Sequence, residues 1–138
     1  MSYLLDTNVV SELVRARPDP QVVDWVRRTS DYGLYLSVLS IGELRKGVER
    51  LPVGERRERL VHWVEWALPA WFGSRLLPID LRIAERWGRT CASNPRALPA
   101  IDTLLAATAL AHDLAMVTRN VADFEVPGLR VIDPWTSP

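Results

Sequence analysis

The sequence predicts an α/β fold in which a central parallel sheet of four to five strands has helices on both faces. Short apolar runs of strand length alternate along the chain with longer stretches whose apolar residues recur at helical spacing. Strands separated by helices pair in parallel through right-handed crossovers, which place helices on both faces of the sheet. The length of 138 residues suits one domain, which we expect to span residues 1–138.

The expected strands are short and mostly apolar. They are predicted at residues 3–6, 34–38, 76–79, 115–118 and 129–132. The expected helices lie between them, at residues 20–29, 40–51, 55–67, 80–92 and 100–112. A Pro-Val-Gly sequence at positions 52–54 separates two of these helices, so we expect those two to form a protruding helical hairpin.

The helix starts have their own local reasons. Pro20 stands at a first-turn position, where its missing N–H leaves no hydrogen bond unmade. Ser40 is predicted to be the N-cap of the helix at 40–51, with Glu43 three residues on in the capping-box spacing. Asp80 is predicted to cap the next helix.

Composition excludes several classes of protein. The 17 basic and 17 acidic residues balance, so any contact with nucleic acid must come from a local patch. No apolar stretch approaches the ~18 residues of a membrane span, and the first residues lack the pattern of a secretory signal, which makes the cytoplasm the expected location. Cys91 is the only cysteine, so an internal disulfide is excluded, and we expect its side chain to be buried or half-buried.

Four carboxylates stand near one edge of the predicted sheet. Asp6 ends the first strand and Asp123 follows the fourth, while Glu43 and Asp102 are expected in the first turns of two helices. Each has an ordinary structural interpretation as a cap, a capping-box partner, a helix-dipole charge or a turn residue. Polar sites in parallel sheets form beyond the carboxyl ends of the strands, so we expect the four acids to converge.

Convergence makes the repulsion between these acids severe. Two like charges ~4 Å apart repel by roughly 4 kcal/mol even at an effective dielectric near 20. Either some of the acids keep a proton with a raised pKa, or a divalent cation neutralises them. Oxygen ligands without nearby cysteine or histidine favour Mg²⁺ or Mn²⁺ over zinc. Such a site, open to water and phosphate, is typical of a phosphodiester hydrolase.

Four sequence blocks resemble those of the PIN-domain family. They are LLDTNVVS at 4–11, GELRKG at 42–47, IDTLLAATA at 101–109 and VTRNVADF at 117–124. The resemblance covers essentially the whole chain in the family's order, and four blocks in series are far more specific than one. The chain is most similar to bacterial VapC-type toxins of type II toxin–antitoxin systems, particularly the FitB-like branch, which often ends in a run such as Asp133-Pro134-Trp135.

The resemblance implies a PIN-like fold and a metal-dependent endoribonuclease. Asp6, Glu43 and Asp102 match the three constant metal-binding acids of the family. The fourth acid has two alternative positions in the family, which here hold Asn120 and Asp123. We favour Asp123 as the acid, with Asn120 as a neutral neighbour that orients metal-bound water.

The expected reaction is hydrolysis of an RNA phosphodiester bond by metal-activated water. Asp6, Asp102 and Asp123 are expected to hold Mg²⁺ or Mn²⁺, and Glu43 to bind metal or orient the attacking water. Single-stranded or loop RNA is the expected substrate, because its backbone can bend into the acid pocket. The residues expected to hydrogen-bond within the pocket are Thr7 and Thr118. The candidates for binding RNA phosphates at its rim are Arg15, Arg45, Lys46 and Arg119.

The resemblance also implies protein partners. Toxins of this family usually form homodimers and are held inactive by a VapB-type antitoxin, in heterotetramers or larger assemblies. The apolar stripe of the predicted hairpin is core-forming and, by the resemblance, also forms a groove for an antitoxin segment, with Arg56, Arg57 and Arg59 near the rim. An antitoxin arginine that reaches the acid pocket is one physical way to block metal binding.

Two alternatives stay open on the sequence alone. A catalytically weak PIN scaffold that acts with its antitoxin in RNA or DNA binding has the same four blocks. A phosphatase of the haloacid-dehalogenase type also starts with an aspartate after the first strand. It needs a second aspartate two positions on, where this chain has Asn8, and its lysine is hard to place. Serine-triad hydrolysis is unsupported, since His62 and His112 are the only histidines and no Gly-x-Ser-x-Gly motif occurs.

Overall fold

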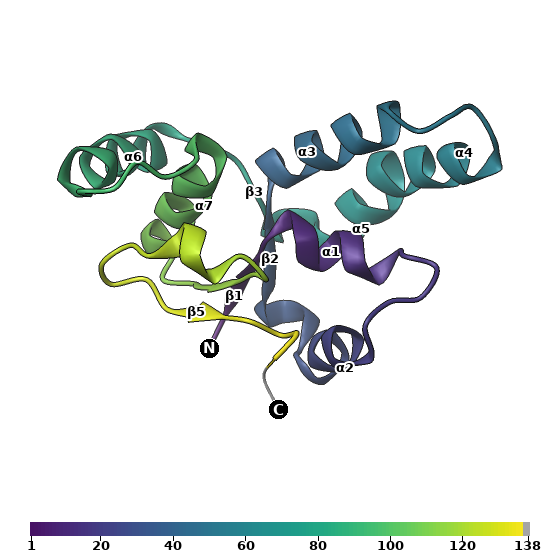
Figure 1. Ribbon diagram of the computed structural model, residues 1–138, viewed down its shortest axis with the longest axis horizontal. Coiled ribbons are helices and arrows are strands. Elements are labelled where there is room, and N and C mark those ends of the chain that lie inside the picture. The colour runs from purple at the N-terminus through teal and green to yellow at the C-terminus, as the bar shows by residue number, and fades with distance from the viewer. Residues whose placement is uncertain (137–138) are drawn as a thin grey trace.

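The computed structural model describes residues 1–136, and these contain a sheet of five parallel strands in the order β3-β2-β1-β4-β5 (Figure 1). The strands are β1 (Tyr3–Leu5), β2 (Leu34–Ser37), β3 (Leu76–Leu77), β4 (Ala115–Val117) and β5 (Val131–Ile132). The expected α/β class with a parallel sheet is confirmed. The strands are shorter than expected because each gives way at once to a helix, turn or loop.

Helices flank the sheet on both sides, as expected. They are α1 (Thr7–Leu13), α2 (Pro20–Arg28), α3 (Val38–Glu49), α4 (Glu55–His62), α5 (Leu68–Phe72), α6 (Leu81–Ser93) and α7 (Ala100–Ala111). Figure 1 shows α6 and α7 on one side of the sheet, with α1, α2 and the paired arms α3 and α4 on the other. No helix within residues 1–136 is long and apolar enough to cross a membrane.

Alternating side chains of the strands fill two separate cores. Leu5 and Leu36 belong to the core that α1, α2, α3 and α5 cover, whereas Leu4 and Met116 belong to the core beneath α7. All four side chains are fully buried. This pattern follows from the period of two along a strand, and it explains why the strands are almost continuously apolar.

The predicted helical hairpin is present, and its second arm is longer than expected. After α4 the chain forms a π-helical turn, Trp63–Ala67, and continues directly into α5. Buried Val64, Leu68 and Phe72 pin this arm to the core. The prediction ended the arm at residue 67, before Pro69, but the π-helical turn directly before Pro69 already interrupts the α-helical hydrogen-bond pattern, and the helical arm continues through the proline.

The predicted cap of α3 is wrong. Ser37 is the N-cap, and its hydroxyl accepts a hydrogen bond from the N–H of Leu39 at 3.0 Å. Because β2 ends at Ser37 with no connecting residues, the helix starts earlier than its capping-box spacing indicated. Ser40 is therefore buried inside α3, and Glu43 lies beyond the first turn.

The expectation for Cys91 is also wrong, since the side chain is exposed. Helix α6 packs on α7 through one narrow face, on which Ile83 is buried and Trp87 donates from its indole N–H to the Thr103 hydroxyl at 2.8 Å. Cys91 lies one helical turn beyond Trp87, near the end of α6 at Ser93, and is exposed there.

Candidate active site

Asp6 sits where β1 becomes α1 and is only 5% exposed. Its backbone N–H donates to the carbonyl of Val117 at 2.9 Å, which ties it to the end of β4. One carboxylate oxygen accepts from the N–H of Thr7 at 2.7 Å, so Asp6 is the N-cap of α1. The structural interpretation of Asp6 as a cap therefore describes its position, but it accounts for only one of the two oxygens.

The second oxygen of Asp6 accepts a hydrogen bond from the buried hydroxyl of Thr118 at 2.7 Å. That hydroxyl in turn accepts from the backbone N–H of Asn120 at 3.0 Å and from the side-chain amide of Asn8 at 3.4 Å. Thr118 thus uses its one proton on Asp6 and both lone pairs on its neighbours. This network fixes the rotamer of the carboxylate.

Glu43 approaches from α3 and is half-buried. The hydroxyl of Thr7 donates to its Oε1 at 2.6 Å and lies 2.9 Å from the buried hydroxyl of Ser40. Since Thr7 directly follows Asp6, the segment that contains one of the four acids also hydrogen-bonds a second, Glu43. Ser40, which the sequence assigned to a helix cap, instead supports this contact.

Asp102 and Asp123 complete the set from the other side of the sheet. Asp102 lies in the first turn of α7 and is half-buried. Asp123 lies in the 3-10 turn Val121–Phe124, which is anchored by Phe124 at 1% exposure. Phe124 packs this turn onto the core beneath α7.

The four acids, named here the acid cluster, act on one another electrostatically. Burial raises the pKa of Asp102 to about 6, and the charges of Asp6, Asp123 and Glu43 add to the rise. Burial also raises the pKa of Asp6, with Glu43 and Asp123 contributing, while the hydrogen bonds from Thr118 and the Thr7 N–H oppose the rise. Chain segments far apart in sequence therefore bring four carboxylates close enough together for their charges to raise the pKa of Asp6 and of Asp102.

The acid cluster is looser than a preformed ligand set. Among residues 1–136, no three His, Cys, Asp or Glu side chains stand in an arrangement that holds a metal ion. Asn120, the alternative fourth position, is exposed and contributes its backbone N–H to Thr118, whereas Asp123 takes part in the mutual repulsion. The roles of these residues stay predictions.

The four basic candidates at the rim differ in their availability. Arg45 contacts the carboxylates of Glu49 and Glu65, so its charge is already compensated, which counts against a role in binding phosphate. Lys46 is exposed and makes no ion pair within the described part of the chain. Arg15 pairs with Glu12 at 3.1 Å through one nitrogen. The fourth candidate, Arg119, lies over the ring of Trp135.

Sequence reasoning missed Glu12, which is only 3% exposed. Besides its pair with Arg15, its second oxygen accepts from the backbone N–H of Asp19 at 2.8 Å. Glu12 therefore fastens the connection between α1 and α2. Arg119 and Trp135, which line a cavity together with Glu12, lie more than 100 positions away in the sequence, so no local pattern identifies Glu12 as buried.

A groove of about 280 Å³ separates α1 from the hairpin arms α3 and α4. Thr7 and Glu43 line it, so the groove opens onto the acid cluster. Its apolar lining is Val14, Leu44, Val48, Leu51, Leu60 and Trp63. Arg15 and Arg56 are the basic residues in its lining, whereas Arg57 pairs with Glu49 at 3.2 Å. We call this the hairpin groove.

Comparison with known proteins identifies the family. The model of the PIN domain matches residues 3–126, and the chain belongs to the PIN-domain family. VapC ribonuclease Y4jK of Sinorhizobium fredii is 38% identical over 136 residues, which cover 96% of each chain.

Solved structures agree with this assignment. The crystal structure of FitAcB from Neisseria gonorrhoeae matches with a TM-score of 0.90 and 33% identity over 98% of this chain and 99% of that chain. A toxin-antitoxin complex from Klebsiella pneumoniae matches with a TM-score of 0.69 and 25% identity over 96% and 98% of the two chains. The expected PIN-like fold is confirmed.

Proposed function

We propose that this chain is the toxin of a toxin–antitoxin pair and acts in the cytoplasm as an endoribonuclease that requires Mg²⁺ or Mn²⁺. The observation that carries the proposal is the gathering of the acid cluster near the carboxyl ends of β1 and β4. There Thr7 hydrogen-bonds both Asp6 and Glu43, and the negative charges of the cluster help to raise the pKa of Asp6 and of Asp102. A relative that spans the same length is a VapC ribonuclease, and a similar structure is a toxin–antitoxin complex. Together they favour RNA cleavage over the phosphatase alternative.

The donor set fits a hard divalent cation. The acid cluster offers carboxylate oxygens, and each Asp6 oxygen keeps a lone pair beyond its one hydrogen bond. Within residues 1–136 no lysine or arginine forms an ion pair with any of the four acids. A bound Mg²⁺ or Mn²⁺ would relieve their repulsion, lower the pKa of water and offset charge on the scissile phosphate.

The residues of the chain have distinct tasks in this proposal. Asp6, Asp102 and Asp123 would hold the cation, and the hydrogen bond from Thr118 fixes the orientation of the Asp6 carboxylate. Glu43, whose Oε1 is held by Thr7, uses its other oxygen to orient the attacking water and to hold the proton that this water loses.

The hairpin groove is the proposed seat of a VapB-type antitoxin. Six large apolar side chains line it together with Thr7 and Glu43, so a segment bound there reaches the acid cluster. A basic side chain at the end of such a segment would replace the metal's charge. We propose that the toxin is a homodimer that assembles with this antitoxin.

A cleavage assay tests the function. The purified chain is expected to cut single-stranded RNA with added Mg²⁺ or Mn²⁺, to stop on chelation and to lose activity as Asp6→Asn. Small phosphomonoesters should not be hydrolysed. RNA binding without metal-dependent cleavage by the wild type would instead favour the scaffold alternative.

A further inference from the structure

A cavity of about 420 Å³ lies between the α1–α2 connection and the chain segments that follow β4 and β5. We call it the arginine cavity. It is separate from the hairpin groove, and Arg15 lines both. The polar and aromatic residues that line it are Glu12, Arg15, Arg17, Asp19, Arg119 and Trp135.

The sheet places this cavity next to the acid cluster. Val117 and Ile132 pair in parallel at the ends of β4 and β5, and the N–H of Thr118 donates to the carbonyl of Ile132 at 2.9 Å. The two segments therefore leave the sheet side by side. Arg119, which lines the cavity, directly follows Thr118, whose hydroxyl donates to Asp6 of the acid cluster.

One face of α1 continues from the acid cluster to the cavity. Asn8 and Glu12 are four residues apart and share that face, and Glu12 pairs at 3.1 Å with Arg15, which lies just beyond the end of α1. The side-chain amide of Asn8 donates to Thr118, and its buried Oδ1 has no hydrogen-bond partner within the described chain. A donor group on a bound strand would satisfy that oxygen.

The charge of the cavity favours an anion. Three arginines and two carboxylates line it, and each carboxylate accepts at least one hydrogen bond from within the chain. Glu12 uses one oxygen on Arg15 and the other on the N–H of Asp19, while Asp19 caps α2 by accepting from the N–H of Gln21 at 2.8 Å. In the described chain neither Arg17 nor Arg119 forms an ion pair.

Arg119 is held in place by an aromatic ring. Its guanidinium carbon lies 5.3 Å from the centroid of Trp135. The indole of Trp135 packs against the core, and the backbone N–H of Trp135 donates to the carboxylate of Asp133 at 2.9 Å. A planar guanidinium supported on one side can stack on a base or bind a phosphate through two nitrogens.

We propose that the arginine cavity binds the nucleotide next to the cleaved bond, on the RNA strand that leaves the acid cluster. The inference rests on the proposed ribonuclease function and names the residues that hold its substrate. Arg17 and Arg119 bind phosphate or base, and Trp135 positions Arg119. An RNA strand is favoured over an acidic peptide because Arg119, which lines the cavity, directly follows Thr118, whose hydroxyl donates to Asp6 of the acid cluster.

The test measures binding of a mixed-sequence single-stranded RNA by fluorescence anisotropy across a salt titration, with the full chain carrying Asp6→Asn throughout to prevent cleavage. Arg119→Ala and Trp135→Leu should each weaken binding about 5-fold or more. Their effects should not add, because one residue acts through the other. Arg17→Ala should reduce the salt slope by about one, and Trp135→Phe should restore most of the affinity.

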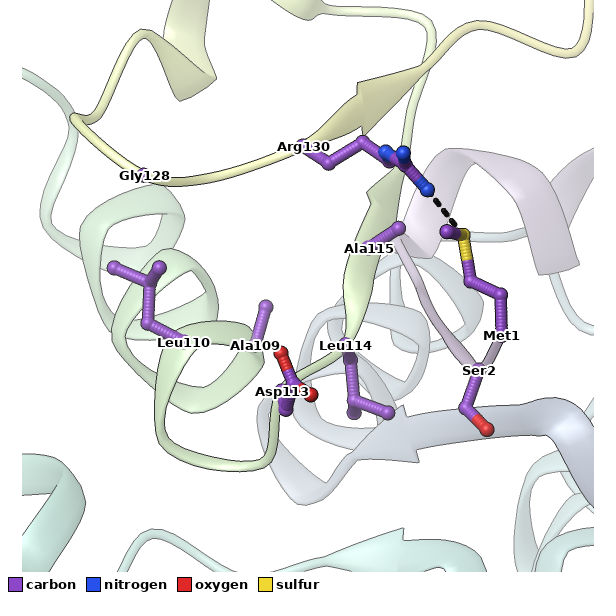
Figure 2. A pocket seen from close by; sticks show the side chains of 9 residues that line it. All are labelled: Met1, Ser2, Ala109, Leu110, Asp113, Leu114, Ala115, Gly128 and Arg130. Carbon is purple, nitrogen blue, oxygen red and sulfur yellow. Dashed lines mark hydrogen bonds between the residues drawn. The ribbon is translucent and has the colours of Figure 1, made fainter.

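Arg130→Ala is the matched control. Arg130 lines a cavity with Met1, Ser2 and Asp113 near the residues that precede β1 and β4, at the opposite edge of the sheet (Figure 2). Its loss should leave RNA affinity unchanged, and thermal unfolding should show that every variant folds.

The outcomes separate this inference from the proposed function. If Arg17→Ala, Arg119→Ala and Trp135→Leu all bind RNA as tightly as the Asp6→Asn parent, the inference is overturned. Cleavage by the wild-type chain would then still support the proposed function. Loss of antitoxin binding with unchanged RNA affinity would also overturn it, in favour of a protein ligand. Absence of cleavage by the unmodified chain would count against the proposed function, whatever the variants bind.

Discussion

The hydroxyl of Thr118 donates a hydrogen bond to Asp6 at 2.7 Å across 112 positions of sequence. This contact joins β4 to the start of α1 at the carboxyl edge of the sheet. It also opposes the rise in the pKa of Asp6 that burial produces. Thr118 therefore keeps a buried carboxylate both oriented and easier to ionise.

Thr118→Val should lower RNA cleavage about 10-fold or more, because partners that orient metal ligands commonly contribute that much. The substitution keeps the shape of the side chain and removes the donor to Asp6. It should also cost about 1–3 kcal/mol of stability, since buried polar groups lose their partner. Cleavage rates and urea unfolding measure the two effects.

Thr108→Val is the matched control. Thr108 is a fully buried threonine in α7 whose hydroxyl bonds the carbonyl of Leu104 at 2.8 Å. Its loss should affect stability but leave the cleavage rate near that of the wild type. Equal losses of activity in the two valine variants would show that Thr118 has no special role at the site.

Asp102→Asn should abolish cleavage and yet raise the thermal midpoint of chelator-treated protein at neutral pH, by about 3 °C. The reason is that the folded state raises the pKa of Asp102 from 3.8 to about 6, so ionisation of this group disfavours folding. Wild-type stability should increase as pH falls from about 6 toward 4, where the folded state takes up the proton first.

The asparagine variant should lack this part of the pH dependence, because it has no proton to take up. Scanning calorimetry at several pH values with chelator present measures both proteins. A lower midpoint for Asp102→Asn than for the wild type at neutral pH would contradict the account of repulsion.

Trp63→Ala should weaken antitoxin binding about 10-fold or more, because buried tryptophans commonly dominate interfaces. Trp63 lines the hairpin groove, whereas Trp66, three residues on, is 65% exposed and does not. Trp66→Ala is therefore the matched control and should bind the antitoxin as the wild type does. Pull-down with titration of the partner compares them, and equal effects would argue against the groove as its seat.

The sequence predicted the order of the five strands and of most helices, although α1 was not among the expected helices, and one topological rule led us to expect the acids at one edge of the sheet. Apolar runs and helical spacing located every strand of the sheet. A parallel sheet then brings the residues after its strands to one edge, which is how Asp6 and Asp123 were expected to meet. Their shared contribution to the pKa of Asp102 agrees with that reasoning.

Some features of the structure could not be predicted from local sequence patterns. Ser40 had the spacing of a helix cap, but β2 runs straight into α3 and Ser37 takes that position. Arg45 was a candidate for phosphate binding, yet a carboxylate 20 positions away, Glu65, engages it. Glu12 looks like a surface acid in the sequence and is buried by the fold.

Direct measurement of Mn²⁺ binding tests the central claim that the acid cluster is one cation site. Isothermal titration of the purified chain should show Mn²⁺ binding that weakens at least about 10-fold in Asp6→Asn, Asp102→Asn and Asp123→Asn. Binding that is absent from the wild type, or unchanged in all three variants, would contradict the account.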